Sequence, residues 1–118
     1  METCLNCFKE AMKLKEVEAR EYSPLALAYL GDAVYELAIR TFVMNHGNTQ
    51  VNKMHKKTAG LVKAEAQANF YKVLEEELTE EEKAVYRRGR NAKSVTMAKH
   101  ATMKDYRMAT GFEALMGY

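Results

Sequence analysis

Apolar residues recur at the spacing of one helix face from Leu25 to Met44, the longest patterned stretch of the chain. Ser23 suits the N-cap position in front of this stretch, and Pro24 suits the first helical position. Gly47 is a suitable residue for ending the helix. The pattern therefore predicts one long helix between Ser23 and Gly47.

A second helical stretch is expected from Val51 to about Glu77, with Asn48 and Thr49 as its capping residues. Gly60 is expected to divide it, because glycine inside a helix costs about 1 kcal/mol relative to alanine. The apolar residues of this stretch share one stripe that we expect to be buried, made of Leu61, Ala64, Ala68, Tyr71 and Leu74.

Two shorter helices complete the pattern. Thr79 and Glu82 form a T-x-x-E capping box, which opens a helix that runs to about Arg88. No apolar period holds over residues 89–101, so this segment is interpreted as a basic loop. A final helix is expected over residues 102–118.

Length and composition favour a single small helical domain. One proline and six glycines among 118 residues are few for a protein rich in β-turns, and eight methionines favour helix. Hydrophobic residues at 47% and charged residues at 29% are typical of a globular protein rather than a disordered one. We therefore interpret the chain as all-α, with residues 1–22 as a helical or partly frayed lead-in and residues 23–118 as the functional domain.

Acidic and basic residues are separated along the chain, although the net charge is only +2. The acidic block contains Glu75, Glu76, Glu77, Glu80, Glu81 and Glu82. The basic residues that follow are opposed only by Asp105, and they are Arg87, Arg88, Arg90, Lys93, Lys99, Lys104 and Arg107. Such runs occur on solvated helix faces and on surfaces that bind phosphates, so charge alone leaves both interpretations open.

Other features exclude several classes of protein. Cys4 and Cys7 form a lone C-x-x-C without the second pair that a structural zinc site needs, so we interpret them as incidental thiols. Residues 1–9 lack the apolar segment of a signal peptide. The most apolar segment, residues 25–43, carries three charged residues, which argues against a membrane span. A cytoplasmic protein is expected.

Asp32 stands out because it lies in a nearly continuous apolar run. A carboxylate in such surroundings needs a partner, a metal ion or water, since burying a bare charge is unfavourable. An acid on the exposed stripe of an amphipathic helix is the simpler interpretation, and it stays open. Tyr29 and Glu36 share the face of Asp32; we expect Tyr29 to pack, and Glu36 to pair with Arg40.

Glu113 is the second acid inside an apolar helical run, between Phe112 and Ala114. If the two helices pack side by side, Asp32 and Glu113 could converge on a divalent cation. Magnesium prefers oxygen ligands and commonly takes one or two protein carboxylates, and such a site supports phosphodiester hydrolysis. The pattern alone does not establish that the two acids meet.

Four segments resemble motifs of the ribonuclease III family. Residues 27–36, which read L-A-Y-L-G-D-A-V-Y-E, resemble its signature helix, and residues 111–117, G-F-E-A-L-M-G, are similar to its second acidic motif. Residues 87–94, R-R-G-R-N-A-K-S, resemble the basic loop of the short Mini-III subgroup, and residues 55–57, H-K-K, are similar to its intervening helix. The resemblance extends over residues 24–118 with the motifs in matching order.

The resemblance implies an all-α ribonuclease III endonuclease fold that cleaves double-stranded RNA with Mg²⁺, leaving 5′-phosphate and 3′-hydroxyl ends. The family's metal-binding aspartate corresponds to Asp32 and its final glutamate to Glu113, so these two are the expected catalytic and metal-binding residues. Ala28 and Thr110 stand where longer members carry two further acids, and this reduced set is typical of Mini-III proteins.

RNA contacts are expected from the catalytic domain itself, because the chain leaves no room for the separate RNA-binding domain of longer family members. Duplex RNA is recognised mainly through phosphates and 2′-hydroxyl groups. Arginine and lysine suit the phosphates, while asparagine and serine suit sugar or base edges. The expected RNA-binding residues are Arg90, Asn91, Lys93 and Ser94, with a second group formed by His55, Lys56 and Lys57.

The resemblance further implies a homodimer formed through the signature helix, and precursor large-subunit (23S) ribosomal RNA, cut at a paired stem, as the natural substrate. Two other functions stay open. One is a non-catalytic, ribosome-associated RNA-binding member of the family, against which the retention of Asp32 and Glu113 argues. The other is a helical interaction module without an RNA partner. Because the chain ends at Tyr118, inside the last expected helix, a truncated C-terminal end also stays open.

Overall fold

Six α-helices and no β-strand make up the part of the chain that the structure describes. The structure is a computed structural model, which describes residues 2–92 and 102–118, with side chains from residue 5 onward. Two 3-10 turns span Ala19–Glu21 and Glu75–Glu77. The all-α prediction is confirmed by the helices, which are α1 (Glu2–Ala11), α2 (Pro24–Asn45), α3 (Val51–Val62), α4 (Ala64–Leu74), α5 (Glu80–Asn91) and α6 (Met103–Gly117).

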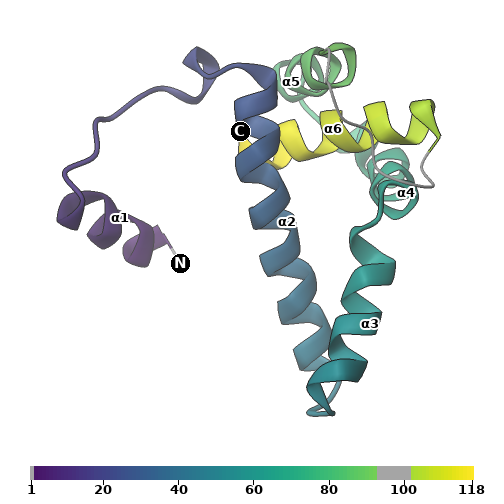
Figure 1. Ribbon diagram of the computed structural model, residues 1–118. Coiled ribbons are helices and arrows are strands. Elements are labelled where there is room, and N and C mark those ends of the chain that lie inside the picture. Colours follow the sequence, from purple (N-terminus) through teal and green to yellow (C-terminus); the bar gives the residue numbers. More distant parts are fainter. Residues whose placement is uncertain (1, 93–101) are drawn as a thin grey trace.

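Helix α6 is the central element of this arrangement. It contacts α2, α4 and α5, and Figure 1 shows it crossing the N-terminal half of α2. Helices α2 and α3 form a long hairpin, at whose upper end α4 passes toward α6. Helix α1 stands apart from these five helices. The last residues of α6 therefore lie beside the first turns of α2.

The ends of α2 follow the local sequence signals. The Ser23 side chain accepts a hydrogen bond from the backbone N–H of Ala26 at 3.1 Å, and Pro24 is the first helical residue. Gly47 has a φ of +145°, a backbone conformation that favours glycine, and it ends the element. The predicted start and end of this helix are confirmed.

The break between α3 and α4 lies at Lys63, and not at Gly60 as predicted. Lys63 is extended, with φ −69° and ψ 157°. Tertiary contacts satisfy the carbonyl groups at the end of α3: the Tyr35 hydroxyl donates to Leu61 O at 2.7 Å, and Gln67 Nε2 donates to Val62 O at 2.8 Å.

The predicted cap of α3 was also wrong. Gln50 occupies the N-cap position without a side-chain hydrogen bond, so Asn48 and Thr49 do not cap this helix. In the expected buried stripe, Ala68 and Tyr71 are buried and Leu61 and Ala64 are half-buried, whereas Leu74 is exposed. The expected stripe is thus confirmed for Ala68 and Tyr71 and wrong for Leu74, which lies on an exposed side of α4.

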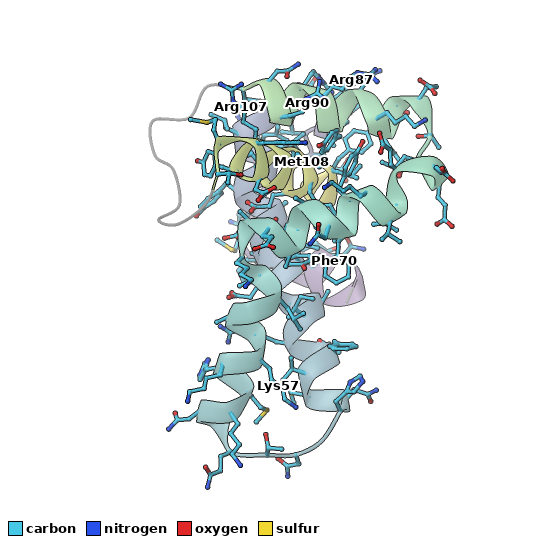
Figure 2. All side chains as sticks on the ribbon, turned by 90° about the vertical axis from the view of Figure 1, so that its right-hand side faces the viewer. Lys57, Phe70, Arg87, Arg90, Arg107 and Met108 are labelled. Atoms are coloured by element: carbon cyan, nitrogen blue, oxygen red, sulfur yellow. The ribbon has the colours of Figure 1, made fainter. Side chains whose placement is uncertain are left out.

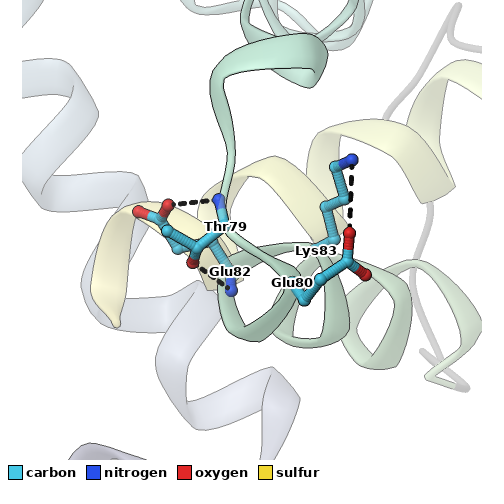
Figure 3. Close-up of polar contacts among 4 residues, drawn as sticks. All are labelled: Thr79, Glu80, Glu82 and Lys83. Carbon is cyan, nitrogen blue, oxygen red and sulfur yellow. Dashed lines mark hydrogen bonds and ion pairs between the residues drawn. The ribbon is translucent and has the colours of Figure 1, made fainter.

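Helix α5 opens with the predicted capping box, drawn in Figure 3. The Thr79 hydroxyl accepts from Glu82 N at 3.1 Å, and the Glu82 carboxylate accepts from Thr79 N at 2.8 Å. An ion pair between Glu80 and Lys83 at 3.7 Å adds to the same turn. The sequence signal for this helix start is therefore confirmed.

The C-terminal end of α5 differs from the prediction. The helix continues to Asn91, so residues 89–91 are helical and do not belong to a loop. Gly89 is buried against α6, where a Cβ atom on it would lie 2.7 Å from the Cβ of Ala114. Packing against α6 thus keeps residues 89–91 helical, although they have no apolar period of their own. Residues 93–101 of the expected loop lie outside the described residues.

An aromatic cluster joins α2, α4, α5 and α6 in the core. Tyr35 meets Phe112 edge to face, with ring centroids 5.2 Å apart. Tyr71 stacks on Tyr86 at 3.6 Å with the two planes 7° apart. The first pair holds α6 against α2 next to Glu113, and the second holds α4 against α5.

Helices α2 and α6 cross in direct backbone contact. A Cβ atom on Gly31 would overlap the carbonyl oxygen of Glu113, and one on Gly117 would overlap the carbonyl oxygen of Leu27. The two glycines face each other across the crossing, so neither position accepts a side chain without separating the helices. The crossing lies directly beside Asp32 and Glu113.

We predict that Gly31→Ala lowers the free energy of unfolding by on the order of 3 kcal/mol, because the added methyl group must push α6 away from α2. Urea denaturation of the two proteins measures this difference. Gly60→Ala is the matched control, since nothing lies within 4 Å of its Cβ position in the interior of α3. It should raise stability by roughly 0.5–1 kcal/mol. Equal effects of the two substitutions would contradict the proposed overlap.

Candidate active site

Asp32 and Glu113 lie close together at the crossing of α2 and α6. Asp32 follows Gly31 on α2 and is exposed, whereas Glu113 is half-buried on α6. The backbone contact of Gly31 with the Glu113 carbonyl brings the two helices as near as their main chains allow. Two acids that are far apart in the sequence therefore share one small region of the molecule.

The electrostatics of this pair are unfavourable without a cation. The pKa of Glu113 is raised to about 7, chiefly by burial and next by the negative charge of Asp32, while the Gln67 side chain acts in the opposite direction. Near neutral pH the carboxyl group of Glu113 is thus shared between its protonated and ionised forms. A positive charge placed between the two acids would favour the ionised form of Glu113.

The donor set fits a hard divalent cation that keeps most of its water ligands. Within the described residues, no group of three or more Asp, Glu, His or Cys side chains is arranged so that it could hold a metal ion. Magnesium commonly binds one or two protein carboxylates and completes its shell with water and phosphate oxygens. Asp32 and Glu113 match that requirement in number and in chemistry.

Two neighbours of Asp32 on the same helix have different roles. Glu36 pairs with Arg40 at 3.5 Å, as predicted from their spacing, and the pair is exposed. Tyr29 is 85% exposed, so the expectation that it packs is wrong within this chain. Sequence alone could not tell which side of the helix the core would occupy, because both sides are apolar.

Arg90 and Asn91 lie together at the C-terminal end of α5. Arg90 Nε donates to Asn91 Oδ1 at 3.3 Å, and the Arg90 guanidinium group lies over the Tyr86 ring, 5.8 Å from its centroid. Lys93 and Ser94, which were also expected to bind RNA, lie outside the described residues. The described half of the predicted basic segment is therefore part of a helix and is held against an aromatic ring.

These two residues border a basic hollow between α4, α5 and α6, the side of the molecule drawn in Figure 2. Its charged lining residues are six cations and Glu75, the cations being Lys72, Lys83, Arg87, Arg90, Lys104 and Arg107. Sequence reasoning missed Lys72 and Lys83, because both stand next to the acidic block along the chain. Only the packing of three helices brings them to the arginines.

The basic hollow lies on the opposite face of α6 from the carboxylate pair. Lys104 and Glu113 are separated by 113 − 104 = 9 residues, about two and a half helical turns. A phosphate in the hollow is therefore distinct from one held at the acids. The hollow can supply binding affinity, but it cannot by itself present the phosphate that is cut.

His55, Lys56 and Lys57 are exposed on α3. Figure 2 shows Lys57 at the lower end of the molecule, whereas Arg87, Arg90 and Arg107 are at the upper end. The structure thus does not bring the two predicted groups of RNA-binding residues together within one chain.

Cys7 is an exposed free thiol on α1. Among the described residues, no helix has the length and apolar character needed to cross a membrane.

Comparison with known proteins decides the family. A model of the ribonuclease III domain matches residues 25–118. The chain belongs to the ribonuclease III family. It is therefore an endoribonuclease of the family that acts on double-stranded RNA, and the resemblance seen in its motifs is confirmed.

Relatives within this family carry the name Mini-ribonuclease 3. The protein from Clostridium tetani is 53% identical over 86% of this chain and 68% of its own length. The protein from Enterococcus faecalis is 50% identical over 84% of this chain and 76% of its own length. A crystal structure of a Fusobacterium nucleatum protein is 37% identical, with a TM-score of 0.75 over 83% of this chain and 78% of that chain. The helical arrangement described above is thus also found in an experimental structure.

We predict that, without metal, the chain loses stability as pH rises from about 4.5 to about 7, because folded Glu113 holds its proton more tightly than the unfolded chain does. The folded state binds more protons in this range, so the free energy of unfolding falls with pH. Urea denaturation in a chelating buffer, for the wild type and for Glu113→Gln, isolates this contribution as the difference between the two curves. Parallel curves across the range would contradict it.

Proposed function

We propose that the chain hydrolyses double-stranded RNA at the crossing of α2 and α6, with Asp32 and Glu113 holding Mg²⁺. The observation that carries the proposal is the convergence of these two carboxylates, where burial and then the charge of Asp32 raise the pKa of Glu113. Bound there, magnesium supplies the Lewis-acid charge that phosphodiester hydrolysis needs. The products are 5′-phosphate and 3′-hydroxyl ends.

The protein's own residues contribute the placement of the reacting groups. Glu113 is half-buried, which limits the water around its carboxylate and strengthens its interaction with a cation. Asp32 is exposed on the neighbouring helix and stays open to the RNA backbone. One acid thus anchors the site, and the other faces the substrate.

RNA is bound, in this proposal, by the lysines and arginines that lie away from Asp32 and Glu113. Arg90 and Asn91 border the basic hollow, whose lysines and arginines suit the regularly spaced phosphates of a duplex. Lys93 and Ser94, which lie outside the described residues, are proposed to bind RNA as well, while His55, Lys56 and Lys57 form a second group on α3. We propose that a duplex contacts both groups and that precursor 23S ribosomal RNA, in the cytoplasm, is the natural substrate.

A homodimer through α2 is part of the proposal. The face of α2 that is not buried in the core is largely apolar, and its exposed residues include Leu25, Tyr29, Leu30, Val34 and Leu37. A contiguous apolar surface of this kind is typical of a protein interface. In such a dimer two sites would face one duplex and cut one strand each, leaving short staggered ends.

Cleavage of a long RNA duplex with Mg²⁺ tests the proposed function. Asp32→Asn and Glu113→Gln should each reduce the cleavage rate by roughly 100-fold or more, because each removes a charged ligand of the metal. Glu36→Gln is the matched control on the same helix; it loses only the exposed pair with Arg40 and should cut normally. Duplex binding without cleavage by the wild type would instead support the non-catalytic, ribosome-associated alternative.

The proposed interface predicts that Val34→Glu makes the chain monomeric, because it places a charge within the apolar face of α2. Sedimentation velocity of the wild type and the variant measures the change. Val73→Glu on α4 is the control, since Val73 is 77% exposed and lies outside this face. A monomeric wild type, or dimers that both substitutions leave intact, would argue against an interface on α2.

A further inference from the structure

Gln67 is a buried polar residue directly beside the carboxylate pair. It lies in the first turns of α4 and is only 2% exposed. Besides Gln67, Thr58 is the only polar or charged residue among the described ones that is buried to this degree. No motif quoted for the family includes Gln67, and none of the steps proposed above uses it.

The amide group of Gln67 can be oriented from its partners. Nε2 donates to the Val62 carbonyl oxygen at 2.8 Å, and because a carbonyl can only accept, the nitrogen must face α3. The same side chain lies beside Glu113, where it acts to lower the pKa of that carboxyl group, as a donor to the ionised form does. The amide nitrogen therefore bonds to the end of α3 and also acts on the acid of α6.

The amide oxygen of Gln67 is left without a partner. Among the described side chains, Oε1 is the one buried nitrogen or oxygen atom that makes no hydrogen bond. A buried acceptor without a partner lowers stability, and an apolar side chain of the same length would avoid that loss. The bond to Val62 explains one role of the amide, and its effect on the Glu113 carboxyl group indicates a second.

We propose that Gln67 is a positioning residue, whose amide holds the Glu113 carboxylate beside Asp32 in the orientation in which both acids can bind one divalent cation. This inference rests on the proposed function of the pair. Two like charges tend to turn away from each other, and a donor behind Glu113 resists that rotation. Because the donor is neutral, it does not compete with the metal, as a lysine in the same place would.

Binding of Mn²⁺ in the absence of RNA, followed by electron paramagnetic resonance, tests the proposal without relying on catalysis. Gln67→Met keeps the length of the side chain and removes both donors. It should weaken Mn²⁺ binding by roughly 10-fold. In cleavage assays the Mg²⁺ concentration for half-maximal rate should rise to a similar extent, while saturating Mg²⁺ restores most of kcat.

Leu61→Ala is the control for a purely structural effect. Leu61 is a half-buried residue at the same junction of α3 and α4, and its substitution should lower Tm without changing Mn²⁺ affinity. Equal Mn²⁺ binding by the wild type and Gln67→Met would overturn the proposal. So would a loss of affinity in Leu61→Ala as large as that in Gln67→Met.

A measurement on the Gln67 side chain itself covers the case in which Gln67→Met does not fold. The amide N–H₂ resonances of Gln67 in a ¹⁵N spectrum should shift in Glu113→Ala and stay in place in Glu36→Ala. Unchanged resonances in Glu113→Ala would overturn the proposal. If the wild type itself binds no Mn²⁺, the proposed metal site at Asp32 and Glu113 is wrong. That outcome is distinguishable from equal Mn²⁺ binding by the wild type and Gln67→Met, which overturns only the role of Gln67.

Discussion

The backbone contact between α2 and α6 is the constraint on which the rest of the structure depends. Gly31 and Gly117 let two helices approach so closely that each glycine's missing side chain is replaced by main-chain atoms of the other helix. This contact places Asp32 beside Glu113, although the two acids are 113 − 32 = 81 residues apart in the sequence. The aromatic core then fixes α6 in rotation, so that Glu113 faces the neighbouring acid and α4.

Charge is distributed over this frame in two separate regions. The acids gather where the helices cross, with a neutral amide as their buried neighbour, and the cations gather in the basic hollow on the other face of α6. Had a lysine or arginine reached Glu113, it would have neutralised the acid and removed the need for a metal ion. Separation of the two regions keeps the acidic pair free for a cation while leaving the cations free for phosphate groups.

Helix α2 carries apolar side chains both on its buried side and on its exposed side. One side carries Leu27, Tyr35, Ile39 and Val43 into the core, and the other leaves Tyr29, Leu30 and Val34 exposed. This explains why the apolar run around Asp32 looks continuous in the sequence. A helix that is apolar nearly all round is normally buried on all sides, and the proposed dimer would cover the exposed side.

Local signals were sufficient for much of the helical pattern. The cap at Ser23, the stop at Gly47 and the capping box of Thr79 and Glu82 lie where the sequence predicts them, because each is formed within one or two helical turns. The all-α class and the family membership could also be predicted, since both follow from residue type and the order of the motifs. The two acids were recognisable as unusual for the same reason.

Other features depended on contacts between distant segments. The break at Lys63 and the extension of α5 to Asn91 follow from packing against α2, α4 and α6, which no local pattern contains. The basic hollow and the position of Gln67 are likewise assembled from separate helices. Residue type and spacing thus determined which helices could form and which acids stand out in their surroundings, whereas only tertiary packing decided what lies beside them, because proximity across helices is set by the whole fold.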